Sequence, residues 1–261
     1  MTSYAGRHAD FYDIFYADKP YEAEASFVHE CLQKYSAQPP RVLLELACGT
    51  GGHAFAMEKY GYSIIATDYS EDMLSHARRK AEKRKSKIEF RLQDMRELDL
   101  PEGPFDAVYC LFDSIGYVES NEALEQVFQG VNAHLKSEGL LVLEFWHAAA
   151  MLKSYDPLRV LKKQTPNGEL IRISETTLDV ERQLARVVYT IYEILEKGTH
   201  HKIQEVHQNR YFLVQEMDAW LSRFGFSPLR WCAGFDNEEE INASTWHIVV
   251  VAKKNETWNM I

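Results

Sequence analysis

The sequence has few cysteines and no long apolar run. Its four cysteines, Cys31, Cys48, Cys110 and Cys232, include no C-x-x-C pair, which argues against a zinc knuckle. Three of them lie in strand or helix patterns, so we expect reduced core residues rather than disulfides. No uncharged stretch approaches the roughly 20 apolar residues of a membrane span. The first residues also lack the basic and apolar segments of a signal peptide. These absences predict a cytoplasmic protein without a membrane anchor.

Positive charge is also in short supply. The 261 residues include 39 Asp and Glu against 29 Lys and Arg, a net charge of -10 with a pI of about 5.5. An acidic surface repels phosphate backbones, so we expect no nucleic-acid partner. Hydrophobic residues make up 46% of the chain, enough for one large core, or for a core domain with an insertion.

Strand-like and helix-like segments alternate through the first part of the chain. Residues 1–36 are aromatic-rich and have helical spacing. Five nearly continuous apolar runs follow, as expected of parallel strands buried on both faces: "RVLLELA", "SIIATD", "KIEFRL", "FDAVYCLF" and "LLVLEFW". Helices are expected between them at 52–60, 70–84 and 121–136. This order predicts a doubly wound, Rossmann-like α/β fold with a mostly parallel sheet.

The alternation stops after Trp146. Three strand-like segments follow without intervening helices, "ELIRISETTLD", "QLARVVYTIYEIL" and "HKIQEVHQNRYFL". A helix and two further strands then return to the main sheet and bring it to seven. We therefore expect a helical lid at 1–36, a Rossmann-like domain at 37–148 and 214–261, and an inserted antiparallel sheet for substrate binding at 149–213. The exposed edges of that sheet could also support a homodimer.

A glycine-rich turn follows the first strand. Gly49 and Gly51 permit a tight turn and close approach of a ligand, and Asp68 ends the second strand, where a carboxylate can accept ribose hydroxyls. With Ala54 the glycines also fit the dinucleotide fingerprint, which leaves NAD as an alternative. Three features favour a cofactor in which an amino acid is joined to adenosine. Glu45 is an acid in the first strand, Asp94 is a further acid after the third strand, and the glycines suit a ligand that has no phosphates.

Several motifs together resemble one family. "VLLELACGTG", "IIATDYSEDML", "RLQDM" and "FDAVYCLFDSIGYV" resemble class I S-adenosylmethionine-dependent methyltransferases. The segment "HADFYDIFYADKPYEAEA", with "DSIGYV" and "VNAHLKSEGLLVLEFW", is similar to bacterial nucleotide-sugar amine N-methyltransferases and related small-molecule enzymes. The resemblance implies S-adenosylmethionine as cofactor, a small-molecule acceptor and a set of cofactor-binding residues. These are Tyr16, Tyr21, Glu45, Ala47, Gly49, Asp68, Tyr69, Met73, Gln93, Asp94, Met95 and Leu111. Tyr12 is expected to pack against the core instead.

Methyl transfer needs alignment of three atoms and exclusion of water. Asp113, Tyr117 and His147 follow the fourth and fifth strands and are the candidate catalytic residues. His147 can act as a base near neutral pH, and Tyr117 matches a position that the resemblance implies for orienting the acceptor. An NAD-dependent oxidoreductase and a non-catalytic cofactor-binding protein remain alternatives.

Histidines in the third strand of the predicted insertion raise the question of a metal. His201, Glu205 and His207 can share one face of that strand, and His200 lies beside them. Neighbours two apart on one strand rarely converge enough to bind a metal. We therefore expect a solvated or substrate-facing surface and no metal.

Overall fold

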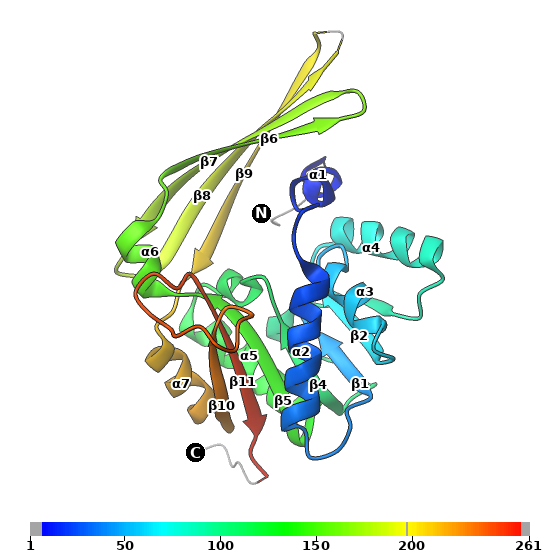
Figure 1. Ribbon diagram of the computed structural model, residues 1–261, viewed down its shortest axis with the longest axis vertical. Coiled ribbons are helices and arrows are strands. Elements are labelled where there is room, and N and C mark those ends of the chain that lie inside the picture. The colour runs from blue at the N-terminus through cyan, green and yellow to red at the C-terminus, as the bar shows by residue number, and fades with distance from the viewer. Residues whose placement is uncertain (1–6, 197, 257–261) are drawn as a thin grey trace.

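A seven-stranded, mostly parallel sheet forms the main domain. The computed structural model describes residues 7–196 and 198–256 (Figure 1). The strands lie in the order β10-β11-β5-β4-β1-β2-β3, with β11 antiparallel to both of its neighbours. Their bounds are β1 Val42–Glu45, β2 Ser63–Asp68, β3 Glu89–Leu92, β4 Phe105–Cys110, β5 Leu135–Trp146, β10 Phe226–Ala233 and β11 His247–Lys254. The predicted Rossmann-like fold is confirmed.

Helices cover both faces of this sheet because consecutive strand residues point to opposite sides. Leu43 packs in a core cluster with α2 (Tyr21–Tyr35), α3 (Gly52–Glu58) and α4 (Glu71–Arg84). Leu44 packs on the other side with α5 (Asn121–His134) and α7 (Val214–Arg223). The strands therefore read as unbroken apolar runs, and their carboxyl ends are left uncovered at one edge of the domain.

The inserted sheet stands over that edge. It has four antiparallel strands, β6 (Leu158–Thr165), β7 (Gly168–Asp179), β8 (Leu184–Leu195) and β9 (His200–Arg210). The sequence predicted the last three but missed β6 and the helix α6 (Ala148–Ser154). The reason is that β6, "LRVLKKQT", has no buried residue and so shows no apolar face to read.

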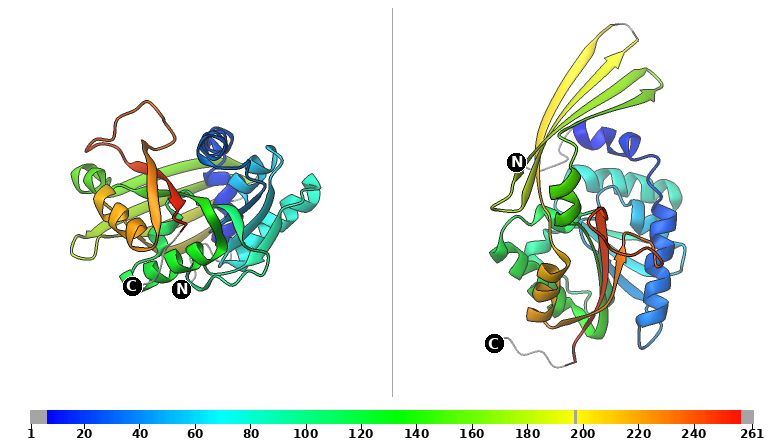
Figure 2. Two further views of the ribbon diagram at one scale, coloured as in Figure 1. Left: turned by 90° about the horizontal axis from the view of Figure 1, so that it is seen from below. Right: turned by 60° about the vertical axis from the view of Figure 1, so that its left-hand side comes forward.

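Helix α1 (Arg7–Phe15) joins the two layers and lies between the inserted sheet and α4 (Figure 2). Phe11 and Phe15 pack against Leu170 and Ile191 of the inserted sheet. On the other side, Ala9 and Tyr12 pack with Met73 of α4. The helix therefore holds the inserted sheet and the cofactor domain together over the edge where the strands end.

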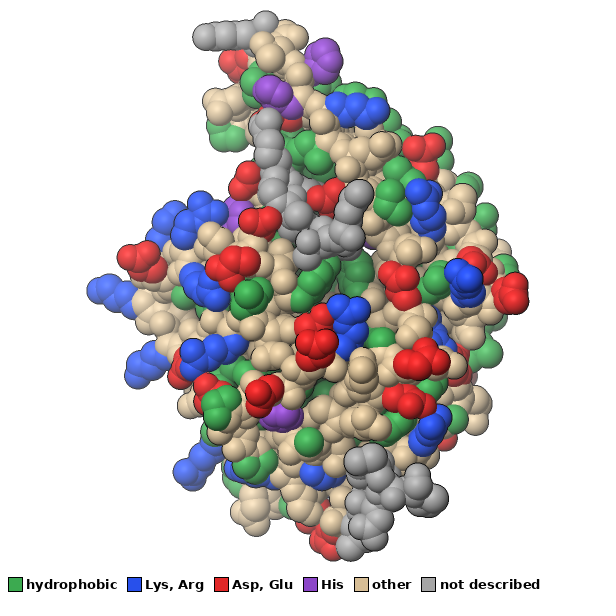
Figure 3. Space-filling view, turned by 180° about the vertical axis from the view of Figure 1, so that it is seen from behind, with side chains coloured by type: hydrophobic (Ala, Val, Ile, Leu, Met, Phe, Trp, Pro, Cys, Tyr) green, Lys and Arg blue, Asp and Glu red, His purple; other side chains and the backbone are tan. Residues whose placement is uncertain are grey.

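Acidic and basic side chains are interspersed over the face shown in Figure 3. Within the described part of the chain, no helix is both long and apolar enough to cross a membrane. Cys31, Cys48, Cys110 and Cys232 are all buried and free, as their strand and helix patterns predicted.

Candidate active site

The turn after β1 is built from residues with left-handed backbone. Ala47 has φ 52°, Gly49 φ 55° and Gly51 φ 83°. A Cβ on Gly49 would lie 3.3 Å from Cε of Met73, and one on Gly51 would lie 2.9 Å from the Phe55 ring. Glycine is therefore favoured at both positions, most strongly at Gly51, whereas Ala47 holds a left-handed conformation at a cost in backbone strain. Such strain in a loop is frequent at ligand-binding sites.

Asp68 connects the end of β2 to this turn. Its Oδ2 accepts the N–H of Gly49 at 2.7 Å and its Oδ1 accepts the N–H of Ser70 at 2.8 Å. Burial raises the pKa of Asp68 to about 6, although these backbone donors oppose the rise. The carboxylate thus fixes the glycine turn before any ligand is bound.

Two adjoining cavities open at the carboxyl ends of the strands. The larger, of about 450 Å³, runs from the glycine turn to the inserted sheet, and the smaller, of about 140 Å³, lies beyond Tyr69. Most of the residues predicted to bind the cofactor line one or both. These are Tyr16, Ala47, Gly49, Asp68, Tyr69, Met73, Gln93, Asp94 and Met95. The smaller cavity has the polar edge of Gln93, Asp94 and Arg96, which suits an adenine.

Three predicted cofactor residues lie behind the cavity walls. Tyr21 packs edge-on against the ring of His53, with centroids 4.8 Å apart. Glu45 is buried and accepts a hydrogen bond from Tyr109 Oη at 3.1 Å. Burial raises its pKa to about 8, and the charge of Asp68 adds to the rise. Leu111 is buried and presents its carbonyl to Ser114 Oγ at 2.8 Å.

Tyrosines of α1 form the cover over the glycine turn. Tyr12 and Tyr16 both line the larger cavity, with ring centroids 4.7 Å apart. Tyr16 also meets Phe112 edge to face at 5.1 Å. Tyr12, expected only to pack, thus also lines the larger cavity. Its position could not be read from spacing alone because it depends on where α1 docks.

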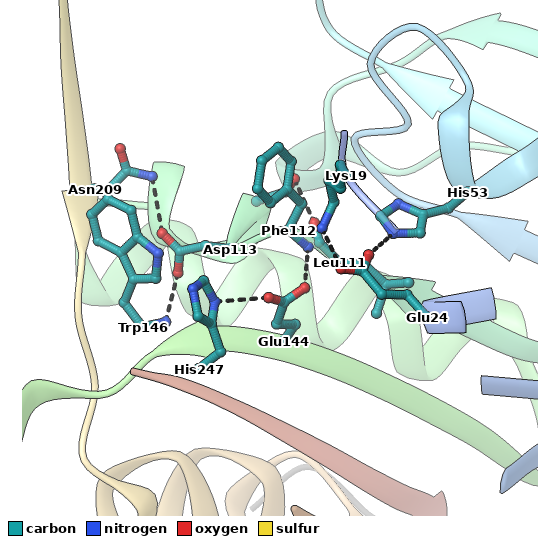
Figure 4. A network of polar contacts seen from close by, with 11 residues as sticks. Lys19, Glu24, His53, Leu111, Phe112, Asp113, Glu144, Trp146, Asn209 and His247 are labelled. Atoms are coloured by element: carbon teal, nitrogen blue, oxygen red, sulfur yellow. Dashed lines mark hydrogen bonds and ion pairs between the residues drawn. The ribbon is translucent and has the colours of Figure 1, made fainter. Parts of the chain in front are cut away.

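The chain after β4 is strained and tied down by buried acids (Figure 4). Phe112 and Asp113 have φ 58° and 56°. Asp113 Oδ1 accepts the Trp146 N–H at 2.7 Å, and its Oδ2 accepts the side-chain amide of Asn209 at 3.2 Å. Burial raises the pKa of Asp113 well above its usual range. Asp113 lines the cavity and also joins the loop after β4 to β5 and β9.

Tyr117 lies where the two cavities meet, in the short 3-10 helix η2 (Ser114–Tyr117). Its hydroxyl is 2.9 Å from Nδ1 of His207, whose Nε2 is 3.0 Å from Glu205 Oε2. A chain of three polar groups therefore fixes the direction of the Tyr117 hydroxyl. His207 and Glu205 share one face of β9, as predicted. In the described residues no three His, Cys, Asp or Glu side chains converge as metal ligands.

The structure does not bring His147 to the cavity. Its side chain is buried, and its Nδ1 lies 3.1 Å from the carbonyl oxygen of Thr245. A different histidine, His247 at the start of β11, lines the cavity together with Trp146. Sequence reasoning missed His247 because it enters the site by the antiparallel pairing of β11 with β5, which no local pattern indicates.

The inserted sheet supplies a basic and aromatic wall. Arg172 Nη1 donates to Tyr16 Oη at 3.2 Å. Its guanidinium lies 4.8 Å from the Phe15 ring centroid and 5.1 Å from that of Tyr189. Arg159, on the neighbouring strand, also lines the cavity. An arginine among aromatic faces is suited to bind an anionic group of a ligand.

The residues present fit S-adenosylmethionine. The glycine turn leaves room for close approach, the carboxylate of Asp68 is fixed beside it, and tyrosine faces suit a sulfonium cation. The basic side chains of the larger cavity, Arg159 and Arg172, come from the inserted sheet rather than from the glycine turn. Among the residues lining that cavity, no lysine or arginine belongs to the glycine turn, where the phosphates of a dinucleotide would bind.

Comparison with known proteins agrees with this geometry. Residues 43–139 match the family model described as a methyltransferase domain. One relative is a protein of Geobacillus sp. (strain WCH70) that is named "putative methyltransferase", without an acceptor. It is 29% identical to this chain over 248 residues, which cover 94% of this chain and 98% of the relative. Identity is also 29% over 221 residues, 84% of this chain and 89% of the relative, to the Streptomyces venezuelae dTDP-3-amino-3,4,6-trideoxy-α-D-glucopyranose N,N-dimethyltransferase.

A solved structure shares the fold. The S-adenosylmethionine-bound amino pentose methyltransferase CalS10 of Micromonospora echinaspora superposes with a TM-score of 0.76 and 21% identity, covering 98% of this chain and 99% of that one. These matches give no support to the NAD alternative. The methyltransferase domain model and the relatives, together with the shared fold, support a class I S-adenosylmethionine-dependent methyltransferase.

Proposed function

We propose that this enzyme methylates the amino group of a nucleotide-linked sugar. The observation that carries the proposal is the continuity of the larger cavity, which runs from the glycine turn to Arg159 and Arg172 on the inserted sheet. A nucleotide-linked sugar has an anionic diphosphate on one side of its ring and can have an amine on the other. The arginines suit the first group and the end of β4 lies near the second.

The proposed roles follow the position of each residue. Asp68 would hold the ribose, and Gln93 and Asp94 the adenine edge, of S-adenosylmethionine, which supplies an electrophilic methyl group. Asp113 keeps the strained loop after β4 in place through its bonds to Trp146 and Asn209. Tyr117, fixed by His207, is placed to orient the acceptor amine. Alignment of this kind is worth roughly 7–11 kcal/mol of the barrier.

The proposal also concerns the surroundings of the enzyme. A small-molecule acceptor fits a concave cavity lined by α1 and the inserted sheet better than a polymer would. Four buried, free cysteines are typical of a reducing compartment, which supports a cytoplasmic location.

The test compares three acceptors that differ in one group each. Purified enzyme and S-adenosylmethionine are incubated with dTDP-3-amino-3,4,6-trideoxy-α-D-glucopyranose, with its 3-hydroxy analogue and with the free amino sugar lacking the nucleotide. Formation of S-adenosylhomocysteine is then measured. We expect turnover with the first and little with the other two. Equal turnover with the free amino sugar would remove the nucleotide from the proposal, and turnover only with the hydroxyl analogue would remove the amine.

A further inference from the structure

A buried carboxylate holds His247 at the wall of the larger cavity. Glu144 on β5 is 2% exposed, and its Oε2 accepts the N–H of the strained Phe112 at 2.5 Å. Its other oxygen, Oε1, lies 2.8 Å from Nδ1 of His247 (Figure 4). The contact has the distance of an ion pair without the alignment of a hydrogen bond. The imidazole side chain is 41% exposed, toward the cavity that it lines.

This contact determines which ring nitrogen can accept a proton. A carboxylate oxygen 2.8 Å from Nδ1 requires a proton on Nδ1, because two lone pairs at that distance would repel each other. In the neutral ring the lone pair is then on Nε2, which has no hydrogen-bond partner among residues 7–196 and 198–256. In enzymes, a carboxylate paired with an imidazole nitrogen fixes the tautomer and stabilises the imidazolium that forms. Here Glu144 would do so by close charge contact with Nδ1 and not through an aligned hydrogen bond.

From this geometry we infer that His247 is the proton acceptor for the acceptor amine and that Glu144 is its positioning residue. The inference rests on the proposed function, because it requires an amine. An alkyl amine reaches the site mostly as an ammonium ion, which has no lone pair with which to attack a methyl group. The ammonium passes one proton to His247 Nε2 and becomes a neutral amine. The amine nitrogen then forms its bond to the methyl carbon, while the sulfur keeps the electron pair of the broken bond.

The groups around His247 are compatible with a transient positive charge. Glu144 faces His247 from β5, and Asp113 faces it from the loop after β4. The pKa of Asp113 is raised chiefly by burial, and the charge of Glu144 adds to the rise. Lys19, drawn with them, has its Nζ 4.1 Å from the Phe112 ring centroid and is paired with Glu24 Oε1 at 2.6 Å. Arg159 and Arg172 line the same cavity from the inserted sheet. An imidazolium at His247 therefore forms beside one carboxylate, with the lysine already neutralised.

The kinetic test uses His247→Gln, with His201→Gln at the exposed tip of β9 as the matched control. Single-turnover methylation of dTDP-3-amino-3,4,6-trideoxy-α-D-glucopyranose is followed across the pH range. We expect H247Q to be slower by about 10²–10⁴-fold near neutral pH, the usual contribution of a positioned base. The deficit should shrink as the pH rises and the amine loses its proton in solution. The affinity for S-adenosylhomocysteine and the rate of H201Q should be unchanged. A loss that is the same at every pH would overturn the inference.

A second measurement needs no acceptor. Nitrogen-15 NMR of histidine-labelled enzyme, bound to S-adenosylhomocysteine, reports which ring nitrogen of His247 carries the proton, and H247Q identifies its signal. We expect a protonated Nδ1 and a bare Nε2, with the preference lost in Glu144→Gln. A protonated Nε2 in the neutral ring would overturn the inference. If wild-type enzyme methylates none of the amines, the proposed acceptor has failed and the role of His247 as proton acceptor for an amine fails with it, whereas an expected NMR result would leave only the tautomer of His247 established.

Discussion

Single residues at this site hold conformations that the rest of the fold must support. Ala47, Phe112 and Asp113 are three non-glycine residues with positive φ, and all line the larger cavity. Each such residue costs roughly 1–3 kcal/mol. The carboxylates of Asp68 and Glu144 accept backbone N–H groups of these loops, and Asp113 accepts the N–H of Trp146 at the end of β5. The acids of this site therefore act first on the protein's own backbone, and any contact with ligand is added to that role.

Asp68→Ala should weaken binding of S-adenosylhomocysteine by about 1–3 kcal/mol, because ribose hydroxyls and the Gly49 N–H would lose their acceptor. Isothermal titration calorimetry measures the change. Asp68→Asn is the matched control, since it keeps one acceptor oxygen and the side-chain shape, and it should lose less. Unchanged affinity in a folded Asp68→Ala enzyme would contradict the ribose assignment.

Glu45→Gln should change how stability depends on pH. The pKa of Glu45 is raised to about 8 in the folded protein from an ordinary 4.5. The folded state therefore holds a proton that the unfolded state releases, and Glu45 lowers the free energy of unfolding progressively as the pH rises from about 5 to 8. The slope is at most about 1.4 kcal/mol per pH unit. Denaturant titrations should show a flatter profile for the variant, whose amide still accepts from Tyr109. Identical slopes would show that Glu45 ionises normally.

Whole elements were predicted from sequence where they bury a continuous face. The helices at 52–60, 70–84 and 121–136 appear as α3, α4 and α5, because helical spacing is a local signal, to which α4 and α5 add capping serines. The last of them ends two residues early, at His134, directly before β5 begins. Strand β6 was missed because none of its residues is fully buried and one face is exposed. The placement of α1 was also beyond local reasoning, since its two packing partners, the inserted sheet and α4, come from distant parts of the chain.

Phe15→Ala should loosen α1 without unfolding the enzyme. Phe15 is 4% exposed and packs with Leu170 and Ile191 of the inserted sheet. Its loss removes the contact that closes α1 over the cavity, so hydrogen exchange in α1 should accelerate selectively. Phe128→Ala, in the main core, is the control and should destabilise the whole domain by about 3–5 kcal/mol. If α1 exchanged at the wild-type rate in Phe15→Ala, this helix would not depend on the inserted sheet.

At the scale of the molecule, the site is the space between the main sheet and the sheet inserted after β5. The sequence predicted the cofactor half well, because glycines and acids at strand ends form a local and ordered pattern. It pointed to His147 rather than His247, and it did not anticipate Arg172 or the link from Tyr117 to His207. These positions depend on the docking of the inserted sheet and on the antiparallel entry of β11, neither of which leaves a local signal.

S-adenosylhomocysteine should raise the melting temperature of the whole enzyme, whereas NAD and NADP should not. A ligand present at 100 times its dissociation constant adds about 2.7 kcal/mol to the free energy of unfolding. For a chain of this size each kcal/mol shifts melting by roughly 2–4 °C. Differential scanning fluorimetry with the three ligands measures the shift. A shift with NAD alone would mean that the glycine turn binds a dinucleotide.

The central claim is that the cavity between the two sheets transfers a methyl group to a sugar amine. It is tested most directly by supplying S-adenosylmethionine with a carbon-13 methyl group and dTDP-3-amino-3,4,6-trideoxy-α-D-glucopyranose, then recording the product by NMR. We expect a labelled methyl resonance with the chemical shift of an N-methyl group, coupled to the ring position that carries nitrogen. A label found only on oxygen or carbon, or no labelled product from an enzyme that binds S-adenosylhomocysteine, would contradict it.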